Sequence, residues 1–119
     1  MRTILIALVL LFSAEQRYIG WIEQNETWVY MYDGYGNRYQ ILPTSNVGTV
    51  MGYSSSFFVS RNGSWVYLYD SNGNRYKTLP YSSVGDVVGV TEKTFISRNG
   101  SWIILWNNRG DKIDWKSAP

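Results

Sequence analysis

Residues 58–80 read FVSRNGSWVYLYDSNGNRYKTLP, and most of the remaining chain follows the same pattern. Trp65 in this stretch lies 37 residues after Trp28 and 37 residues before Trp102. A fixed spacing of roughly 20–50 residues is typical of chains in which one supersecondary unit is copied and stacked. The sequence therefore predicts three tandem repeats, at about residues 18–54, 55–91 and 92–119.

The composition limits the chemistry that the chain can perform. Its 119 residues are enough for one domain with a modest core. The 10 Tyr and 6 Trp favour half-buried sheets or binding faces, because each combines an apolar ring with a polar tip. The net charge of +2, without runs of like charge, argues against a nucleic-acid partner. Because Cys and His are both absent, the chain has no disulfide and lacks the usual zinc and copper ligands. We also expect no cofactor and no bound metal.

The first 14 residues are typical of a secretory signal peptide. Arg2 supplies the positive start, Ile4–Phe12 forms an unbroken apolar run, and Ser13-Ala14 provides the small-residue exit. The run is shorter than the roughly 20 residues of a transmembrane helix, so no transmembrane span is expected. The alternative is a buried N-terminal strand. We expect an exported protein, periplasmic, outer-membrane-associated or extracellular, with a single β-repeat domain over residues 15–119.

The rest of the chain is predicted to be all-β. In the central repeat, strands are expected over Phe57–Arg61, Ser64–Asp70, Arg75–Leu79 and Gly85–Thr91. Asn62-Gly63 is the usual signal of a type I′ hairpin turn, which would place Ser60 opposite Trp65. Each repeat would then be a four-stranded antiparallel meander, and the last repeat would lack its fourth strand. No segment after the signal peptide shows helical periodicity.

Alternation along the second strand of the central repeat gives a sheet that is apolar on both faces. Trp65, Tyr67 and Tyr69 point to one side, and Val66 and Leu68 point to the other. Such a strand needs cover on both sides, as in a sandwich, a propeller or a barrel. Otherwise the aromatic face is left open to bind something.

The order of strand, tight turn, strand ending in Tyr-Asp, Asn-Gly turn and strand resembles short β-propeller repeats. It is also similar to a family of small exported bacterial proteins with tandem W-[VI]-x-x-Y-D-x-N-G-x-x-Y units, which implies export and a repeat architecture. A closed propeller typically has about 4–8 blades. Three repeats therefore favour three-fold closure within one chain, as in a β-trefoil or β-prism. The alternatives are an incomplete propeller-like curved sheet or two chains that form a six-unit ring.

The repeated aromatic positions, with two arginines that precede the hairpin turns, are the candidate ligand-binding or partner-binding residues. They are Trp28, Trp65, Trp102, Tyr30, Tyr67, Tyr32, Tyr69, Trp106, Arg61 and Arg98. Their rings could stack on sugars, or they could form the interface between neighbouring repeats. Ile104 replaces one Tyr in the third repeat, which argues against three identical sites. The arginines could contact an anion, or they could pair across strands and cover a ring.

Two further motifs are interpreted as turns. The segment Asp70–Asn74 and the related Asp33 carry oxygen ligands that could hold Ca²⁺, but a hairpin turn explains them fully. The sequons that begin at Asn25, Asn62 and Asn99 would mark glycosylated turns in a eukaryotic protein, and the latter two coincide with predicted hairpins.

These patterns predict a binding protein without enzymatic activity. Asp86 and Glu92 are the one carboxylate pair that breaks the repeat, and a glycosidase built on them is the remote alternative. We expect a secreted or periplasmic module that presents aromatic strands to a glycan or a cell-envelope protein. The other alternative is a structural subunit of an envelope or extracellular assembly, completed by β-strand addition or homo-oligomerisation.

Overall fold

The computed structural model describes residues 17–119, so the predicted signal peptide at 1–14 lies outside the described residues. The described chain folds into β1 (Trp21–Gln24), β2 (Trp28–Tyr32), β3 (Arg38–Pro43), α2 (Thr44–Val47), β4 (Thr49–Tyr53), β5 (Phe57–Asn62), β6 (Trp65–Asp70), β7 (Arg75–Pro80), α3 (Tyr81–Val84), β8 (Asp86–Val90), β9 (Thr94–Asn99), β10 (Trp102–Asn107) and β11 (Lys112–Ser117). The predicted all-β class is confirmed. The helices α2 and α3 are single turns that the sequence did not predict, and neither could cross a membrane.

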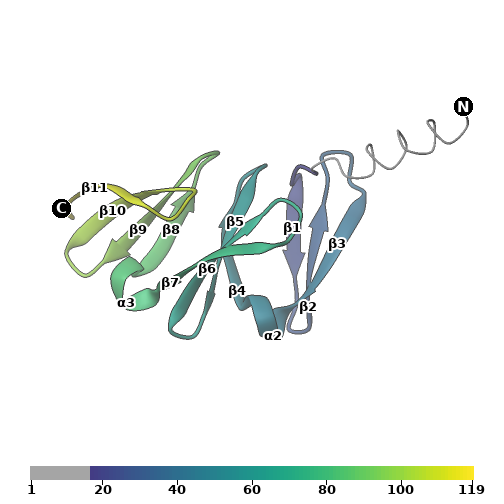
Figure 1. Cartoon of the computed structure of the whole chain (residues 1–119), viewed down its shortest axis with the longest axis horizontal. Helices are drawn as coiled ribbons and strands as arrows, with labels where there is room; N and C mark the ends of the chain where they lie inside the picture. The colour runs from purple at the N-terminus through teal and green to yellow at the C-terminus, as the bar shows by residue number, and fades with distance from the viewer. Residues whose placement is uncertain (1–16) are drawn as a thin grey trace, which may run out of the picture.

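The strands form three antiparallel sheets, which we call the first, middle and last sheets (Figure 1). Their strand orders are β1-β2-β3, β4-β5-β6-β7 and β11-β10-β9-β8. The predicted grouping into four, four and three strands is therefore wrong. The strands expected to end the first two meanders, β4 and β8, pair instead with β5 and β9, the first strands of the following repeats. A helical turn causes this change of partner, because α2 and α3 carry the chain from the edge of one sheet to the start of another.

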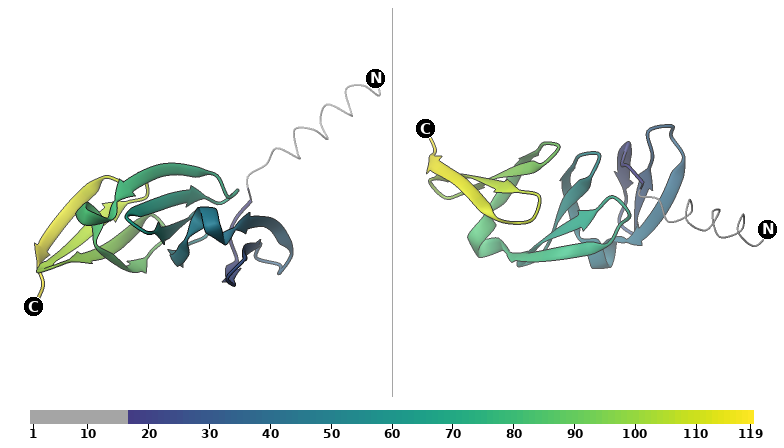
Figure 2. Two further views of the ribbon diagram at one scale, coloured as in Figure 1. Left: turned by 90° about the horizontal axis from the view of Figure 1, so that it is seen from below. Right: turned by 45° about the horizontal axis from the view of Figure 1, so that its top comes forward.

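The three sheets form an open row, with the first and last sheets at opposite ends (Figures 1 and 2). Neighbouring sheets contact each other through their opening strands, since β1 packs against β4 and β4 packs against β8. Three-fold closure within one chain is not confirmed. Within residues 17–119, one face of the first sheet and one face of the last sheet therefore have no other sheet packed on them.

The first and middle sheets share a core in which aliphatic side chains meet aromatic rings. Val29 and Met31 of β2 are fully buried against Phe58 and Tyr69 of the middle sheet. The two rings are stacked, with centroids 4.6 Å apart and planes 1° from parallel. Burial of such side chains is the main stabilising contribution available to a chain without disulfides.

The middle and last sheets meet in the same way. Val66 and Leu68 are fully buried in one cluster with Phe95 and Trp106 of the last sheet. Phe95 and Trp106 are also stacked, with centroids 5.7 Å apart and planes 2° from parallel. The middle sheet is thus covered on both faces, as the alternation along β6 predicts.

The hairpin between β5 and β6 differs from the predicted one. Asn62 pairs with Trp65, so the two-residue loop is Gly63-Ser64. Gly63 has φ +62°, and among the described residues only glycines have a positive φ. This pattern fits a type II′ turn, which requires Gly at its first central position. Asn62 stays in the strand because its side-chain amide donates to two backbone carbonyls of α2, at 3.1 and 3.3 Å. The facing pairs therefore shift by two residues, and the faces of the strands stay as predicted.

Two tyrosine hydroxyls bridge neighbouring sheets. Tyr39 of β3 donates to the Ser71 carbonyl at 2.6 Å, and Tyr76 of β7 donates to the Asn108 carbonyl. Burial is the main cause that raises the pKa of each hydroxyl to about 12. Both hydroxyls are therefore protonated donors well beyond neutral pH.

These bridges predict a loss of stability in alkaline solution. The unfolded chain releases a tyrosine proton near pH 10, whereas the folded chain holds these two protons until about pH 12. Their contribution is fully present below about pH 10 and is lost as the pH rises toward about 12. Urea midpoints measured from pH 9 upward should fall over this window. The matched variant Tyr39→Phe/Tyr76→Phe should show a shallower fall, and an identical fall would contradict this role.

Candidate functional site

The ten predicted binding residues range from exposed to buried, with Tyr30, Tyr32, Tyr67 and Arg61 partly buried between these extremes. Trp28, Trp65 and Trp102 expose 41%, 48% and 48% of their surface. Tyr69 and Trp106 are buried in the two cores between sheets. The structure therefore does not gather these residues into one site. In the middle and last sheets, the tryptophan at the start of the second strand is exposed and the ring four residues later is buried.

The exposed tryptophans occupy one position in each sheet. Trp65 begins β6 beside the hairpin turn and pairs with Pro80, as Trp28 pairs with Pro43 in the first sheet. The β1–β2, β5–β6 and β9–β10 turns lie along the same edge of the row, together with α2 and α3 (Figure 1). An exposed ring favours ligand stacking over packing between sheets. The sequence could not show this, because Trp65 and the buried Tyr69 share one face of the strand.

The two predicted arginines are held by their own hairpins. The Arg61 guanidinium carbon lies 3.5 Å from the centroid of the Tyr81 ring, and its Nη1 atom lies 3.6 Å from an Asp86 oxygen. Its Nε atom donates to the carbonyl of Gly63 at 3.0 Å. Arg98 donates to its own hairpin in the same way, at 3.4 Å. The ring-covering interpretation therefore fits Arg61 better than the anion-binding one.

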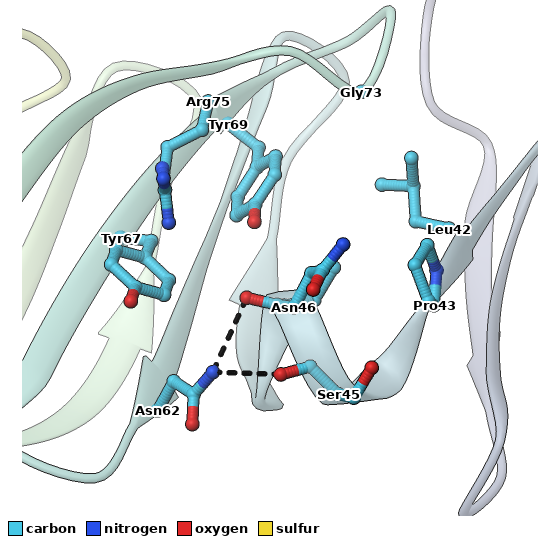
Figure 3. Close-up of a pocket in the computed structure, with 10 residues that line it drawn as sticks. Leu42, Pro43, Ser45, Asn46, Asn62, Tyr67, Tyr69, Gly73 and Arg75 are labelled. Atoms are coloured by element: carbon cyan, nitrogen blue, oxygen red, sulfur yellow. Dashed lines mark hydrogen bonds between the residues drawn. The ribbon is translucent and has the colours of Figure 1, made fainter.

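A groove between the first and middle sheets brings together the most varied set of binding groups (Figure 3). Its volume is about 610 Å³. It is lined by Leu42, Pro43, Ser45, Asn46, Val47, Asn62, Tyr67, Tyr69, Gly73 and Arg75. Of these, Tyr67 and Tyr69 were predicted from the sequence as binding residues.

The tyrosines and Arg75 form one wall of the groove. The Arg75 guanidinium carbon lies 4.3 Å from the centroid of the Tyr67 ring, and the Tyr67 and Tyr69 rings meet edge to face at 6.3 Å. In Figure 3 the hydroxyl end of Tyr69 points toward α2, that of Tyr67 points toward Asn62, and the Asn46 side chain extends from α2 into the space between Tyr69 and Leu42. Asn62 holds α2 in place through its two hydrogen bonds. The wall thus offers hydroxyl, amide and guanidinium groups to one ligand.

Arg75 is the one charged side chain among the residues that line the groove. Burial raises the pKa of the Tyr69 hydroxyl, and the charge of Arg75 and a hydrogen bond from it oppose that rise. Among the described residues, the ion pairs are Arg61–Asp86 and Arg109–Asp111, so Arg75 has no carboxylate within 4.0 Å. Its charge is therefore available to an anionic group of a ligand.

Sequence reasoning missed Arg75, although a signal for it exists. Arg38, Arg75 and Lys112 follow one another at the repeat spacing of 37 residues. The Arg38 guanidinium carbon lies 5.2 Å from the Tyr30 centroid in the first sheet, which repeats the Arg75–Tyr67 contact. A repeated cation next to a repeated tyrosine could have been noticed beside the aromatic row.

The turn interpretation of the acidic loops agrees with the structure. An Asp70 oxygen accepts from the backbone amides of Asn72 and Asn74, at 2.9 and 3.0 Å. Asp33 and Asn107 accept in the same two-bond pattern in their own sheets. Within residues 17–119, no three His, Cys, Asp or Glu side chains lie close enough to hold a metal ion.

Asp86 and Glu92, the residues of the remote glycosidase alternative, are not brought together. Asp86 begins β8 and accepts from the Tyr81 hydroxyl at 2.5 Å. Glu92 follows the strand and accepts from the Ser55 hydroxyl at 2.5 Å, which lowers its pKa. At roughly 3.3 Å per residue, the strand separates the two backbones by about 20 Å, whereas paired carboxyl groups of glycosidases lie roughly 5–10 Å apart.

The different surroundings of the exposed and buried rings predict different costs of truncation. Trp106→Ala should lower the free energy of unfolding by about 3–5 kcal/mol, because the ring is buried, stacked on Phe95 and bonded to the Ser97 hydroxyl. Trp65→Ala should cost about 1 kcal/mol or less. Urea denaturation of both variants measures the difference, and equal losses would show that Trp65 is a packing residue.

No family model matches the chain, and no curated protein matches it. Solved structures of Hsv2 from Kluyveromyces lactis, a β-propeller, are similar to it. One superposes with a TM-score of 0.56 at 13% identity and covers 82% of this chain and 32% of Hsv2. Another, with loop 6CD replaced by a Gly-Ser linker, gives a TM-score of 0.54 at 16% identity and covers 81% and 35%. The chain thus spans about a third of the Hsv2 structures it matches. At this identity the likeness concerns the fold alone: the three sheets are arranged like blades of a propeller.

Proposed function

We propose that the chain is a non-enzymatic binding module whose groove between the first and middle sheets takes a carboxylated glycan. The observation that carries the proposal is the Arg75 guanidinium, which lies over Tyr67 without a carboxylate partner among the described residues. Contact with the ring holds the guanidinium in one orientation, so little freedom is lost when it binds a carboxylate.

The other groups of the groove suit a sugar better than an apolar ligand. The two tyrosine hydroxyls, the Asn46 amide and the Ser45 hydroxyl can donate to and accept from sugar hydroxyls. Leu42 and Pro43 supply a small apolar surface on the opposite wall. Ligand sites generally combine such an apolar surface with a few polar groups that fix orientation.

Trp65 offers a second surface near the groove, because its ring lines a separate hollow of about 470 Å³ with Pro80 and Tyr81. It lies two residues before Tyr67 on β6, and alternation along the strand places both side chains on the same face, about 7 Å apart along the strand. Its exposed ring is a second platform for a ligand longer than one sugar ring. The propeller-like fold supports a binding module, and the signal-peptide pattern of residues 1–14 supports a periplasmic or extracellular site of action.

Calorimetric titration with a carboxylated oligosaccharide, oligogalacturonate, and with its neutral counterpart, galacto-oligosaccharide, tests this function. The carboxylated probe should bind more tightly. Arg75→Gln should remove that preference, and Tyr67→Ala should weaken both probes by about tenfold, or about 1.4 kcal/mol. Arg109→Gln is the matched control, because Arg109 is exposed in another turn and already faces Asp111.

Two results would contradict the proposal. Failure of both probes to bind would leave a protein ligand, such as a cell-envelope protein, as the partner to seek. Equal binding by the parent chain, Tyr67→Ala and Arg75→Gln would show that the sugar occupies another surface.

A structural subunit completed by strand addition is the second candidate, and the edge of β1 favours it. The strands that correspond to β1 in the middle and last sheets are β5 and β9, one and two repeats of 37 residues later. Each of them is covered on its outer side by one further strand, β4 or β8. Within residues 17–119 no strand covers the corresponding edge of β1. The uncovered edge thus lies in the first sheet, whereas the sequence placed the missing strand at the end of the last repeat. An exposed edge strand is a template for a strand from another chain.

Amide hydrogen exchange tests strand addition. If a second chain supplies the missing strand, protection of the β1 amides should rise with protein concentration while protection of β5 stays constant. The β5 amides are the internal control, because both edges of β5 are already paired. Protection of β1 that does not change with concentration would argue against this candidate.

A further inference from the structure

The two cores between sheets are built from the same contacts, repeated at a spacing of 37 residues. Val29 and Met31 of the first sheet correspond to Val66 and Leu68 of the middle sheet. On the facing side, the stacked pair Phe58–Tyr69 corresponds to Phe95–Trp106. In each case an aliphatic face of one sheet covers the stacked rings of the next sheet.

The last sheet carries the next aliphatic face of this series, and the described chain leaves it uncovered. Ile103 and Leu105 stand 37 residues after Val66 and Leu68. They are partly exposed, whereas their counterparts are fully buried. With Ile96 and Trp115 they line a largely apolar hollow of about 330 Å³ on this face, and the charged residues Asp114 and Lys116 complete its lining.

The first sheet carries the matching aromatic face. Trp21 and Tyr32 stand 37 residues before Phe58 and Tyr69. They form the same stacked pair, with centroids 4.5 Å apart and planes 18° from parallel. Trp21 nevertheless exposes 44% of its surface, whereas Phe58 is fully buried under the neighbouring sheet.

We propose that a second copy of this chain covers both end faces, with the last sheet of each copy packed on the first sheet of the other. Every molecule carries both the aliphatic face on its last sheet and the aromatic face on its first sheet. The first–middle and middle–last contacts within the chain are two examples of how such faces pack together. The resulting ring has six sheets, within the roughly 4–8 blades of known propellers. It has two-fold symmetry and leaves no end face open.

Two observations favour this head-to-tail ring over other pairings. In both sheet contacts of the described chain, the aliphatic pair of one sheet packs with the stacked rings of the next sheet, and Phe57 adds one ring to the aliphatic side of the middle sheet. A pairing of two last sheets would bring two aliphatic pairs together and leave both sets of rings at the first sheets uncovered. The superposition on Hsv2 shows that successive sheets turn as propeller blades do, so added sheets curve toward closure. Addition without closure would give a filament instead.

The ring would also complete a second groove, independently of whether the first one binds a glycan. Tyr30, Tyr32 and Arg38 stand 37 residues before Tyr67, Tyr69 and Arg75. In the ring, these residues of one copy face the last sheet of the other. The dimer would then hold two tyrosine–arginine grooves within chains and two between chains.

Light scattering on the full chain, with the chain mass measured by mass spectrometry, tests the ring. The parent protein should have twice the chain mass. Leu105→Glu and Trp21→Lys should each be folded monomers, because each places a charge on one end face. Thr78→Glu, an exposed position on β7 of the middle sheet, is the matched control and should stay dimeric.

Mixing the two variants identifies the orientation of the copies. A Leu105→Glu chain keeps its first sheet intact, and a Trp21→Lys chain keeps its last sheet intact. Together they form one unchanged interface and one interface that opposes Glu to Lys, so an equimolar mixture should give a heterodimer. This recovery also shows that neither variant is unfolded.

Three results would overturn the proposal. A monomeric parent protein would show that no copy covers the end faces. Masses above the dimer would show an open assembly. A dimer that Leu105→Glu dissociates but Trp21→Lys does not, with no recovery on mixing, would show pairing between two last sheets.

Discussion

The fold depends on one constraint: each sheet has two apolar faces, and exposure of either face to water costs free energy. Val66 and Leu68 on one side of the middle sheet, and Tyr69 with Phe58 on the other, must both be covered. A single meander cannot meet this requirement, so the sheets stack in a row. The helical turns α2 and α3 serve the same requirement, because they move the chain from one sheet to the next without breaking the stack.

The candidate site is a consequence of this stacking. The opening strands of neighbouring sheets approach each other closely and the side chains of β2, β5 and β6 fill the space between the first and middle sheets, which leaves a groove beside α2 where this packing ends. Tyr69 is buried because it lies under the first sheet, and Tyr67, one pleat nearer the edge, is only partly covered. Arg75 covers the remaining face of Tyr67. The same row of rings thus supplies the core at one end and a polar, cationic wall at the other, which unites the packing and binding interpretations of the aromatic positions.

Local features were predicted from the sequence, and features that join distant residues were not. The strand positions of the central repeat and the faces of β6 follow from alternation and turn residues, and both are confirmed. A repeat of 37 residues can be divided at any point, so it did not show that β4 pairs with β5 rather than with β3. The hairpin register was wrong because the Asn62 side chain binds α2 instead of entering the turn. The groove was missed because Arg75 and Asn46 meet only when two sheets are stacked.

The central claim is that aliphatic and aromatic faces of neighbouring sheets stabilise each other directly, and a double-mutant cycle measures this. Leu68 and Phe95 are fully buried in one cluster between the middle and last sheets. Urea unfolding of Leu68→Ala, Phe95→Ala and the double variant should give a coupling energy of about 0.5–3 kcal/mol. The control cycle of Met31 with Phe95, which lie in different clusters, should be additive. Additive losses for Leu68 and Phe95 as well would contradict the account.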